Sequence, residues 1–111
     1  VLIKSPWKLM IGDFTWIGEG VWIDNVAPVE IGKHCCLSQG VLIETGNHNY
    51  KDPKFGLLQQ QVVIEDGVWL GVKSIVCPGV HVYTHSILAA ASVATANMEA
   101  YGIYQGNPAV L

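Results

Sequence analysis

The sequence has 111 residues, of which half are hydrophobic and 14% are charged; six basic and nine acidic residues give a net charge of -3. This length fits one domain, and the absence of a Lys/Arg cluster argues against a nucleic-acid partner. No apolar run is long enough to cross a bilayer, and no signal-peptide pattern opens the chain. Three cysteines, two of them adjacent, argue against a disulfide framework, so we expect a cytoplasmic protein.

Aliphatic residues recur every six positions, beginning with Ile11, Ile17 and Ile23. A repeat of six is neither a strand period nor a helix period, and it predicts a parallel β-helix. Each hexad would form one short strand and a turn, and three hexads would form a triangular coil of about 18 residues. The series comprises Ile11, Ile17, Ile23, Ile31, Leu37, Ile43, Ile64, Leu70, Val76, Val82 and Leu88.

The aliphatic residue of each hexad should face the interior of the coil. One internal ladder is then predicted to contain Ile11, Ile31, Ile64 and Val82. The residue four places after each aliphatic is usually small, which suits a tight corner. An ordinary β-sandwich would show alternation of two between turns, and no segment shows the 3.6 period of a helix, so we expect no helix longer than two turns before residue 95.

The predicted architecture is a single all-β domain over residues 1–111, with about four or more coils and one inserted loop at about 46–61. The hexad pattern fades at Ala94, so residues from about 95 to 111 are expected to form a C-terminal tail. The chain lacks an initiator Met and begins inside an apolar stretch. We therefore expect a fragment or truncated chain.

The residue just before each aliphatic should point out of the coil, because side chains alternate along a strand. Two of the three outer faces would be apolar and would need a covering partner or ligand. The third would carry polar groups, including two histidines one coil apart. The predicted faces are Trp16, Cys36, Trp69 and Ile87; Trp22, Leu42, Ile75 and Val93; and Pro28, His48, His81 and Glu99.

The insertion "TGNHNYKDPKFGLLQQQ", residues 45–61, is expected to leave the coil immediately after His48. A long excursion from a regular solenoid often covers a site or reaches a neighbour. His48 at its root is a candidate general base for a hydroxyl or an amine. The residue pattern alone fits equally well a surface histidine at the start of a loop.

Four segments in order resemble the hexapeptide-repeat acyltransferases, most nearly the colanic acid and polysaccharide O-acetyltransferase branch: "IGDFTWIGEGVWIDN", "VEIGKHCCLSQGVLIETGNHNY", "VVIEDGVWLGVKSIVCPGVHV" and "GNPAVL". The resemblance implies a left-handed parallel β-helix, an exception to the usual right-handed crossover. It also implies a homotrimer with active sites between subunits. The implied reaction moves an acetyl group from acetyl-CoA to a hydroxyl of a sugar-type acceptor.

By this resemblance His48 matches the base that deprotonates the acceptor, which then attacks the thioester directly. The residues that match acceptor-contacting positions are Asp24, Asn25 and Asn47. Those that match acetyl-CoA-binding positions are Trp69, Gly71, Ala90, Thr95, Asn107 and Pro108. Trp69 could instead pack in a trimer, Thr95 could be a turn residue, and Pro108 could be a rigid exit from the solenoid.

Two positions depart from the family pattern. Relatives commonly place Asp after the histidine, where this chain has Asn49, which cannot stabilise an imidazolium by charge. We therefore expect a backbone carbonyl, or a residue of the 49–61 loop or of a neighbouring subunit, to hold His48. Relatives also commonly carry Lys near Ala96 and basic residues after the "NPA" turn, and both are missing here. We therefore expect the coenzyme phosphates to be held weakly, or by residues outside this sequence.

Two other functions use a comparable scaffold. The γ-type carbonic anhydrases hold zinc with three histidines between subunits, and this chain has His34, His48, His81 and His85. However, His81 and His85 are one residue short of that family's usual spacing, and no metal is expected. A purely structural or ice-binding β-helix would show a repeated outward Thr array, which is not present.

Overall fold

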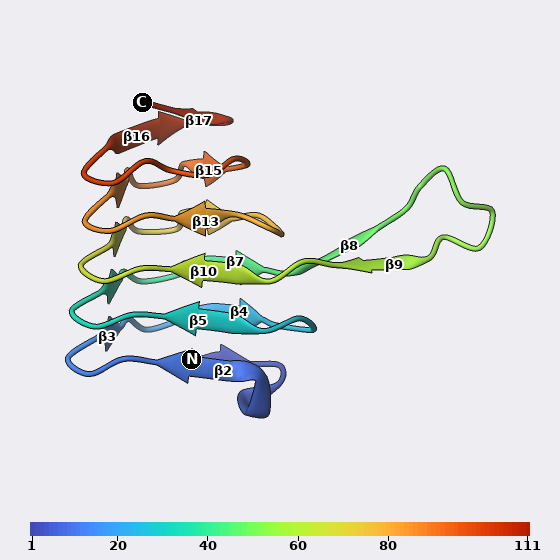
Figure 1. Cartoon of the computed structure of the whole chain (residues 1–111), viewed down its shortest axis with the longest axis horizontal. Helices are drawn as coiled ribbons and strands as arrows, with labels where there is room; N and C mark the ends of the chain where they lie inside the picture. The colour runs from blue at the N-terminus through green and yellow to red at the C-terminus, as the bar shows by residue number, and fades with distance from the viewer.

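The computed structural model describes residues 1–111, which form a stack of about five triangular coils with one hairpin projecting sideways (Figure 1). Each coil contributes short strands to three sheets, named A, B and C. Sheet A contains β1 (Leu2–Ile3), β4 (Trp22–Asp24), β7 (Leu42–Glu44), β12 (Ile75–Val76) and β15 (Val93–Ala94). Sheet B contains β2 (Leu9–Ile11), β5 (Val29–Ile31), β10 (Val62–Ile64) and β13 (His81–Val82). Sheet C contains β3 (Trp16–Ile17), β6 (Cys36–Leu37), β11 (Trp69–Leu70), β14 (Ile87–Leu88), β16 (Ile103–Gly106) and β17 (Ala109–Val110).

The coils are parallel and left-handed. In Figure 1 the strands of sheet B run to the left in front of the strands of sheet A, which run to the right, while the chain rises from its N-terminus to its C-terminus. The one helical element is the short 3-10 turn η1 (Pro6–Lys8). The predicted left-handed parallel β-helix is confirmed, and no helix is long and apolar enough to cross a membrane.

The register of the predicted ladder is also confirmed, although its first member, Ile11, is 43% exposed. Ile11 pairs with Ile31, Ile31 with Ile64, and Ile64 with Val82. The small residues four places further along also face the interior, and Val21, Val41 and Val68 among them are fully buried. Each hexad thus supplies two interior side chains. A fully buried aliphatic side chain contributes about 1.5–3 kcal/mol relative to an exposed one, so the stacked coils are the source of the fold's stability.

Two of the three predicted outer faces are confirmed and the third is wrong. On sheet C, Trp16, Cys36, Trp69 and Ile87 are in register. On sheet A, Trp22, Leu42, Ile75 and Val93 are in register. On sheet B the register is instead Met10, Glu30, Val63 and His81.

The error on sheet B comes from the two insertions, both of which precede strands of this sheet. The two extra residues after Ile23 shift the outward position from Pro28 to Glu30, and the hairpin removes His48 from the coil altogether. At the next coil Met98 bridges to Val82, so Glu99 follows this ladder position instead of preceding it. The predicted vertical pair of His48 and His81 therefore does not form.

The predicted tail begins too early. β16 continues sheet C, with Ile103 beside Ile87 and Tyr104 beside Leu88. Met98 and Tyr104 are buried in the same core cluster as the aliphatic ladders. Met98 follows Ala94 by four residues instead of six, and Tyr104 then follows Met98 by six, so a search that keeps the earlier phase misses both. Within this C-terminal part, only β17 leaves the parallel arrangement, by pairing antiparallel with β16.

One column of residues at the corner between sheets B and C adopts the left-handed backbone conformation. It contains Phe14, His34, Gly67, His85 and Tyr101, with φ between 57° and 73°. Phe14 stacks on His34 and His85 stacks on Tyr101, with ring centroids 5.2 and 5.1 Å apart. Only Gly fits at residue 67, because a Cβ there would lie 2.6 Å from Nε2 of His85. Two of the four histidines are thus part of a stacked corner.

Candidate active site

The hairpin that carries His48, named the arm, leaves the coil at the corner between sheets A and B. It consists of β8 (Gly46–His48) and β9 (Leu57–Gln59), which pair antiparallel and extend away from the solenoid (Figure 1). Buried Thr45 fastens its root: the hydroxyl donates to the Asp24 carbonyl at 2.9 Å and accepts from Ala27 N–H at 3.0 Å. The returning chain donates from Gln60 N–H to the Thr45 carbonyl at 3.0 Å. The arm therefore starts from a fixed point.

The His48 ring is held by Phe55, on the opposite side of the arm. Nδ1 lies 3.1 Å from the Phe55 carbonyl oxygen, and the two rings stack with centroids 4.5 Å apart. Because a carbonyl can only accept, Nδ1 carries the proton in this contact, and in the neutral ring Nε2 then has a free lone pair. The prediction that a backbone carbonyl or a loop residue holds His48 is confirmed. Asn49 does not hold the ring, because its side chain accepts from Lys51 N–H.

The residues predicted to contact the acceptor divide into two groups. Asp24 is half-buried at the root of the arm, and Asn47 is exposed beside His48, whose N–H donates to Oδ1 of Asn47 at 2.8 Å. Asn25 is different: it is completely buried, and its amide exchanges two 2.8 Å hydrogen bonds with the backbone of Ser5. Asn25 fastens the N-terminal segment to the next coil, which leaves it no surface for an acceptor.

Glu44 joins this region, although the sequence reasoning did not single it out. It lies beside Asp24 in the register of sheet A, and its Oε1 accepts from Gly46 N–H, the first residue of the arm, at 2.9 Å. Burial raises the pKa of Glu44, and a hydrogen bond and repulsion from Asp24 raise it further. The signal was present in the sequence, because Asp24 and Glu44 each directly follow a ladder residue.

The residues predicted to bind acetyl-CoA lie on several parts of the chain. Trp69 is half exposed on sheet C and donates from Nε1 to the Ser38 hydroxyl at 3.0 Å. Gly71 packs tightly on the next coil, where an added Cβ would lie 2.6 Å from the Ala90 nitrogen. Thr95 follows β15, and the exposed turn between β16 and β17 contains the last two predicted residues, Asn107 and Pro108.

The two halves of the predicted site face different directions in one chain. The arm leaves the corner between sheets A and B, and the corner of a triangular coil lies opposite its third side, which is sheet C. Trp69 stands on the outer surface of sheet C. His48 and Trp69 of one chain therefore do not form one site. Thr95 lies nearer to the arm, since its strand β15 ends at the same corner.

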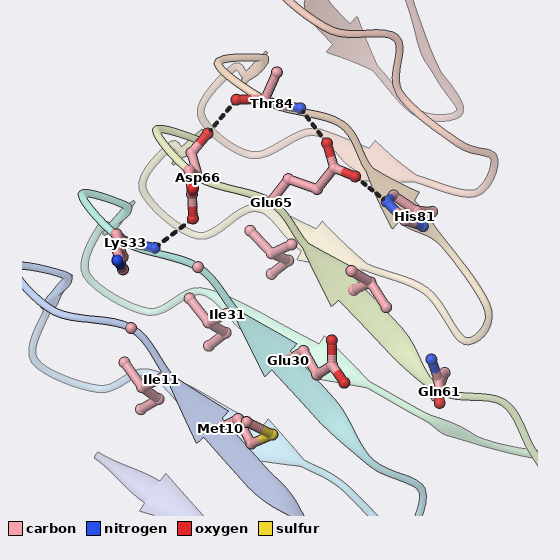
Figure 2. A pocket seen from close by; sticks show the side chains of 14 residues that line it. Met10, Ile11, Glu30, Ile31, Lys33, Gln61, Glu65, Asp66, His81 and Thr84 are labelled. Carbon is pink, nitrogen blue, oxygen red and sulfur yellow. Dashed lines mark hydrogen bonds and ion pairs between the residues drawn. The ribbon is translucent and has the colours of Figure 1, made fainter.

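A groove of about 760 Å³ runs over the outer surface of sheet B (Figure 2). At one end Nε2 of His81 lies 2.7 Å from Oε2 of Glu65, and Thr84 N–H donates to Oε1 at 3.0 Å. The sequence reasoning placed His81 here but gave Glu65 no role. Glu65 follows the ladder residue Ile64, in the way that Asp24 and Glu44 follow theirs.

The four histidines do not assemble into a zinc site. No three His, Cys, Asp or Glu side chains lie close enough together to hold a metal ion. His34 and His85 stack in the corner column, His48 is on the arm, and His81 is paired with Glu65. A zinc enzyme built on this chain would have to draw its ligands from more than one copy.

The chain resembles known acetyltransferases in both sequence and structure. The stacked hexads define a hexapeptide-repeat β-helix, although no family model matches the chain. All 111 residues align, at 32% identity, with a putative colanic acid biosynthesis acetyltransferase of Escherichia coli K12, of which they cover 61%. A hexapeptide-repeat acetyltransferase of Vibrio cholerae, solved with acetyl coenzyme A, matches with a TM-score of 0.93 and 28% identity over 97% of this chain and 61% of its own.

A maltose O-acetyltransferase of Clostridium difficile matches with a TM-score of 0.93 and 25% identity over 98% of this chain and 60% of its own. The chain thus spans about three fifths of the length of these relatives. The resemblance to the hexapeptide-repeat acetyltransferases predicted from the four sequence segments is confirmed.

Proposed function

We propose that the protein transfers an acetyl group from acetyl-CoA to a hydroxyl of a sugar-type acceptor, with His48 as the general base. The observation that carries this proposal is the His48 ring, held through Nδ1 by the Phe55 carbonyl and by stacking on the Phe55 ring. A base needs one nitrogen fixed so that the other can be aimed at the acceptor. The matches to acetyltransferases over the whole chain support the reaction class.

The reaction proceeds by direct attack. Nε2 of His48 accepts the acceptor's hydroxyl proton while the oxygen bonds to the carbonyl carbon of the acetyl group. The carbon–sulfur bond then breaks, and the proton passes from His48 to the departing coenzyme A sulfur. No enzyme thiol takes part, and burial raises the pKa of both Cys35 and Cys77, which keeps them as unreactive thiols.

The active enzyme in this proposal is a homotrimer with its sites between subunits. Two observations support it. The arm and Trp69 face different directions in one chain, so a site that uses both requires two copies. In addition, sheets A and C expose apolar columns that include Trp22, Leu42, Trp16 and Trp69, and symmetric assembly would cover them.

The acceptor is expected to bind at the root of the arm. Asp24, Glu44 and Asn47 present carboxyl and amide groups there. Glu44 and Asn47 precede His48 by four residues and one residue, and Asp24 is paired with Glu44 on the neighbouring strand. The donor is expected to lie along Trp69, Gly71 and Ala90 of a neighbouring copy. Support for a coenzyme site comes from the Vibrio cholerae structure, which contains acetyl coenzyme A.

Ligand binding to the purified chain tests the reaction class. Calorimetric titration with coenzyme A should give saturable binding, and acetyl-CoA with a panel of sugars should release free thiol only when an acceptor is present. Titration with Zn²⁺ is the matched comparison. Saturable zinc binding with no coenzyme A binding would contradict the proposal and favour the zinc alternative.

A further inference from the structure

The groove on sheet B differs from the other two outer faces, because polar and apolar side chains alternate along it. From coil to coil its outward column is Met10, Glu30, Val63 and His81. Strands in a sheet are about 4.8 Å apart, so the column is about 14 Å long. The columns of sheets A and C are apolar throughout. A covering copy of the chain suits those two faces, but not this one.

The wall at one end of the groove is preorganised. Both oxygens of the Glu65 carboxylate are occupied, one by Thr84 N–H and the other by Nε2 of His81. The His81 ring also stacks on Tyr83, with centroids 4.1 Å apart. Figure 2 shows Glu65 and His81 pointing toward each other. In the neutral ring Nε2–H donates to Glu65, so Nδ1 is an acceptor without a partner in the chain, on a side chain that is 32% exposed.

Further along the groove, both donors and acceptors lack partners within the chain. The Glu30 carboxylate accepts no hydrogen bond, while the side chains of Gln61 and Lys33 donate none. A ligand that satisfies this set must both donate and accept along its length, which is the property of hydroxyl groups. The apolar side chains Met10 and Val63 lie between the polar ones and suit the carbon–hydrogen faces of such a ligand.

The charges of the groove narrow the class of ligand. Glu30, Glu65 and Asp66 outnumber Lys33, so the groove is acidic when His81 is neutral. Phosphates, uronic acids and other anions are disfavoured by repulsion. We propose that this groove binds an uncharged saccharide chain, at a site separate from the transfer site at His48. The inference depends on the groove alone and holds whether or not His48 is the base.

The matched variants use two stacked histidines, of which His34 is exposed and His81 is half-buried. His81→Phe keeps a ring against Tyr83 but removes the nitrogen acceptor, and His34→Phe makes the same change in the corner column outside the groove. Maltotetraose and cellotetraose serve as uncharged probes with different linkages, and tetragalacturonate serves as the anionic probe. Amide chemical shifts of the ¹⁵N-labelled full chain report both the site and the affinity.

At least one uncharged probe should shift amides around Glu30, Val63 and His81, and tetragalacturonate should bind about tenfold more weakly. His81→Phe should weaken binding by about fivefold to tenfold, the usual worth of one hydrogen bond, whereas His34→Phe and His48→Ala should leave it unchanged. Glu30→Gln serves as a second groove variant if His81→Phe alters the thermal unfolding midpoint. Three results would each overturn the proposal. Neither neutral probe binds at millimolar concentration, the amide shifts are confined to sheets A and C, or the folded groove variants bind as well as the native chain.

Discussion

The coils and the arm of this protein are built on opposite principles. In the coils, each hexad buries two side chains, and residues such as Leu37, Ile43 and Leu70 have no exposed surface. In the arm, the large hydrophobic side chains Tyr50 and Phe55 are more than half exposed. The coils are thus stabilised by burial, while the arm depends on its two short strands and its fastened root.

Because the coils are buried and the arm is exposed, the residues that stabilise the fold differ from those proposed to take part in the reaction. Regular coils leave no room to vary an interior side chain, whereas an exposed arm tolerates change and presents His48 away from the body of the chain. Functional side chains on loops held by a rigid scaffold are a common arrangement. Substitutions in the coils should therefore act on unfolding, and substitutions on the arm should act on turnover.

The largest effect on stability is expected from a ladder residue. Leu70 is completely buried between Leu37 and Leu88, and Leu70→Ala would leave a cavity between three coils. The free energy of unfolding should fall by about 2–5 kcal/mol. Urea unfolding followed by Trp fluorescence measures it. A loss below about 1 kcal/mol would show that the ladder is not the source of stability.

A smaller loss of stability is expected from Asn25, which holds the N-terminal segment to the next coil through Ser5. Asn25→Ala removes both hydrogen bonds to Ser5 and leaves the buried Ser5 N–H without a partner, while the Ser5 carbonyl keeps only the bond from Lys8 N–H. The expected cost is about 1–3 kcal/mol. Hydrogen exchange should locate the change, with faster exchange confined to residues 2–9 and their neighbours. Uniformly faster exchange in all coils would contradict this local role.

Glu44 should make the root of the arm sensitive to pH. Its pKa is raised, first by burial and then by Asp24, so the folded state favours the protonated form. The stabilisation is complete below the ordinary carboxyl pKa of about 4.3 and is lost as the pH rises through the raised value in the folded protein. Glu44→Gln should therefore be more stable than the native chain at pH 7, and the difference should vanish near pH 4. Melting curves at both pH values test this, and a variant that is less stable at pH 7 would refute it.

The smallest effect is expected at Asn49, the position where relatives commonly carry Asp. Its side chain accepts from Lys51 N–H and makes no contact with the His48 ring, which the Phe55 carbonyl holds. Asn49→Ala should change the free energy of unfolding by less than about 0.5 kcal/mol and leave turnover nearly unchanged. A large loss of turnover in this variant would mean that Asn49, not Phe55, orients the base.

The sequence predicts the coils well because their signal is local. Unbroken hexads set the register of sheets A and C, so Trp16, Trp22 and Trp69 were placed on the correct faces. The prediction of the outward residues of sheet B failed because both insertions precede its strands. The length of an insertion does not reveal at which residue the hexad repeat resumes. Met98 and Tyr104 were missed because the step from Ala94 to Met98 is four residues instead of six, which shifts the phase of the hexads.

Side-chain partners across coils were harder to predict. The sequence indicates that His48 needs a partner, but only the antiparallel pairing of the arm brings the Phe55 carbonyl and ring to it. Likewise Glu65 and His81 are 16 residues apart, and their contact depends on the register of β10 with β13. Asn25 was assigned to the acceptor because a motif records residue type, not burial, and its amide is used within the fold.

The central claim, that the arm carries the catalytic base, is tested most directly by acetyl transfer rates of three variants. His48→Ala should lower turnover by roughly 10²–10⁴-fold, the usual contribution of a positioned base, with coenzyme A affinity nearly unchanged. His81→Ala should lose far less, because His81 lies on sheet B, and Cys77→Ala should keep its activity. If His48→Ala retains near-full turnover while Cys77→Ala abolishes it, neither direct attack nor the assignment of His48 can stand.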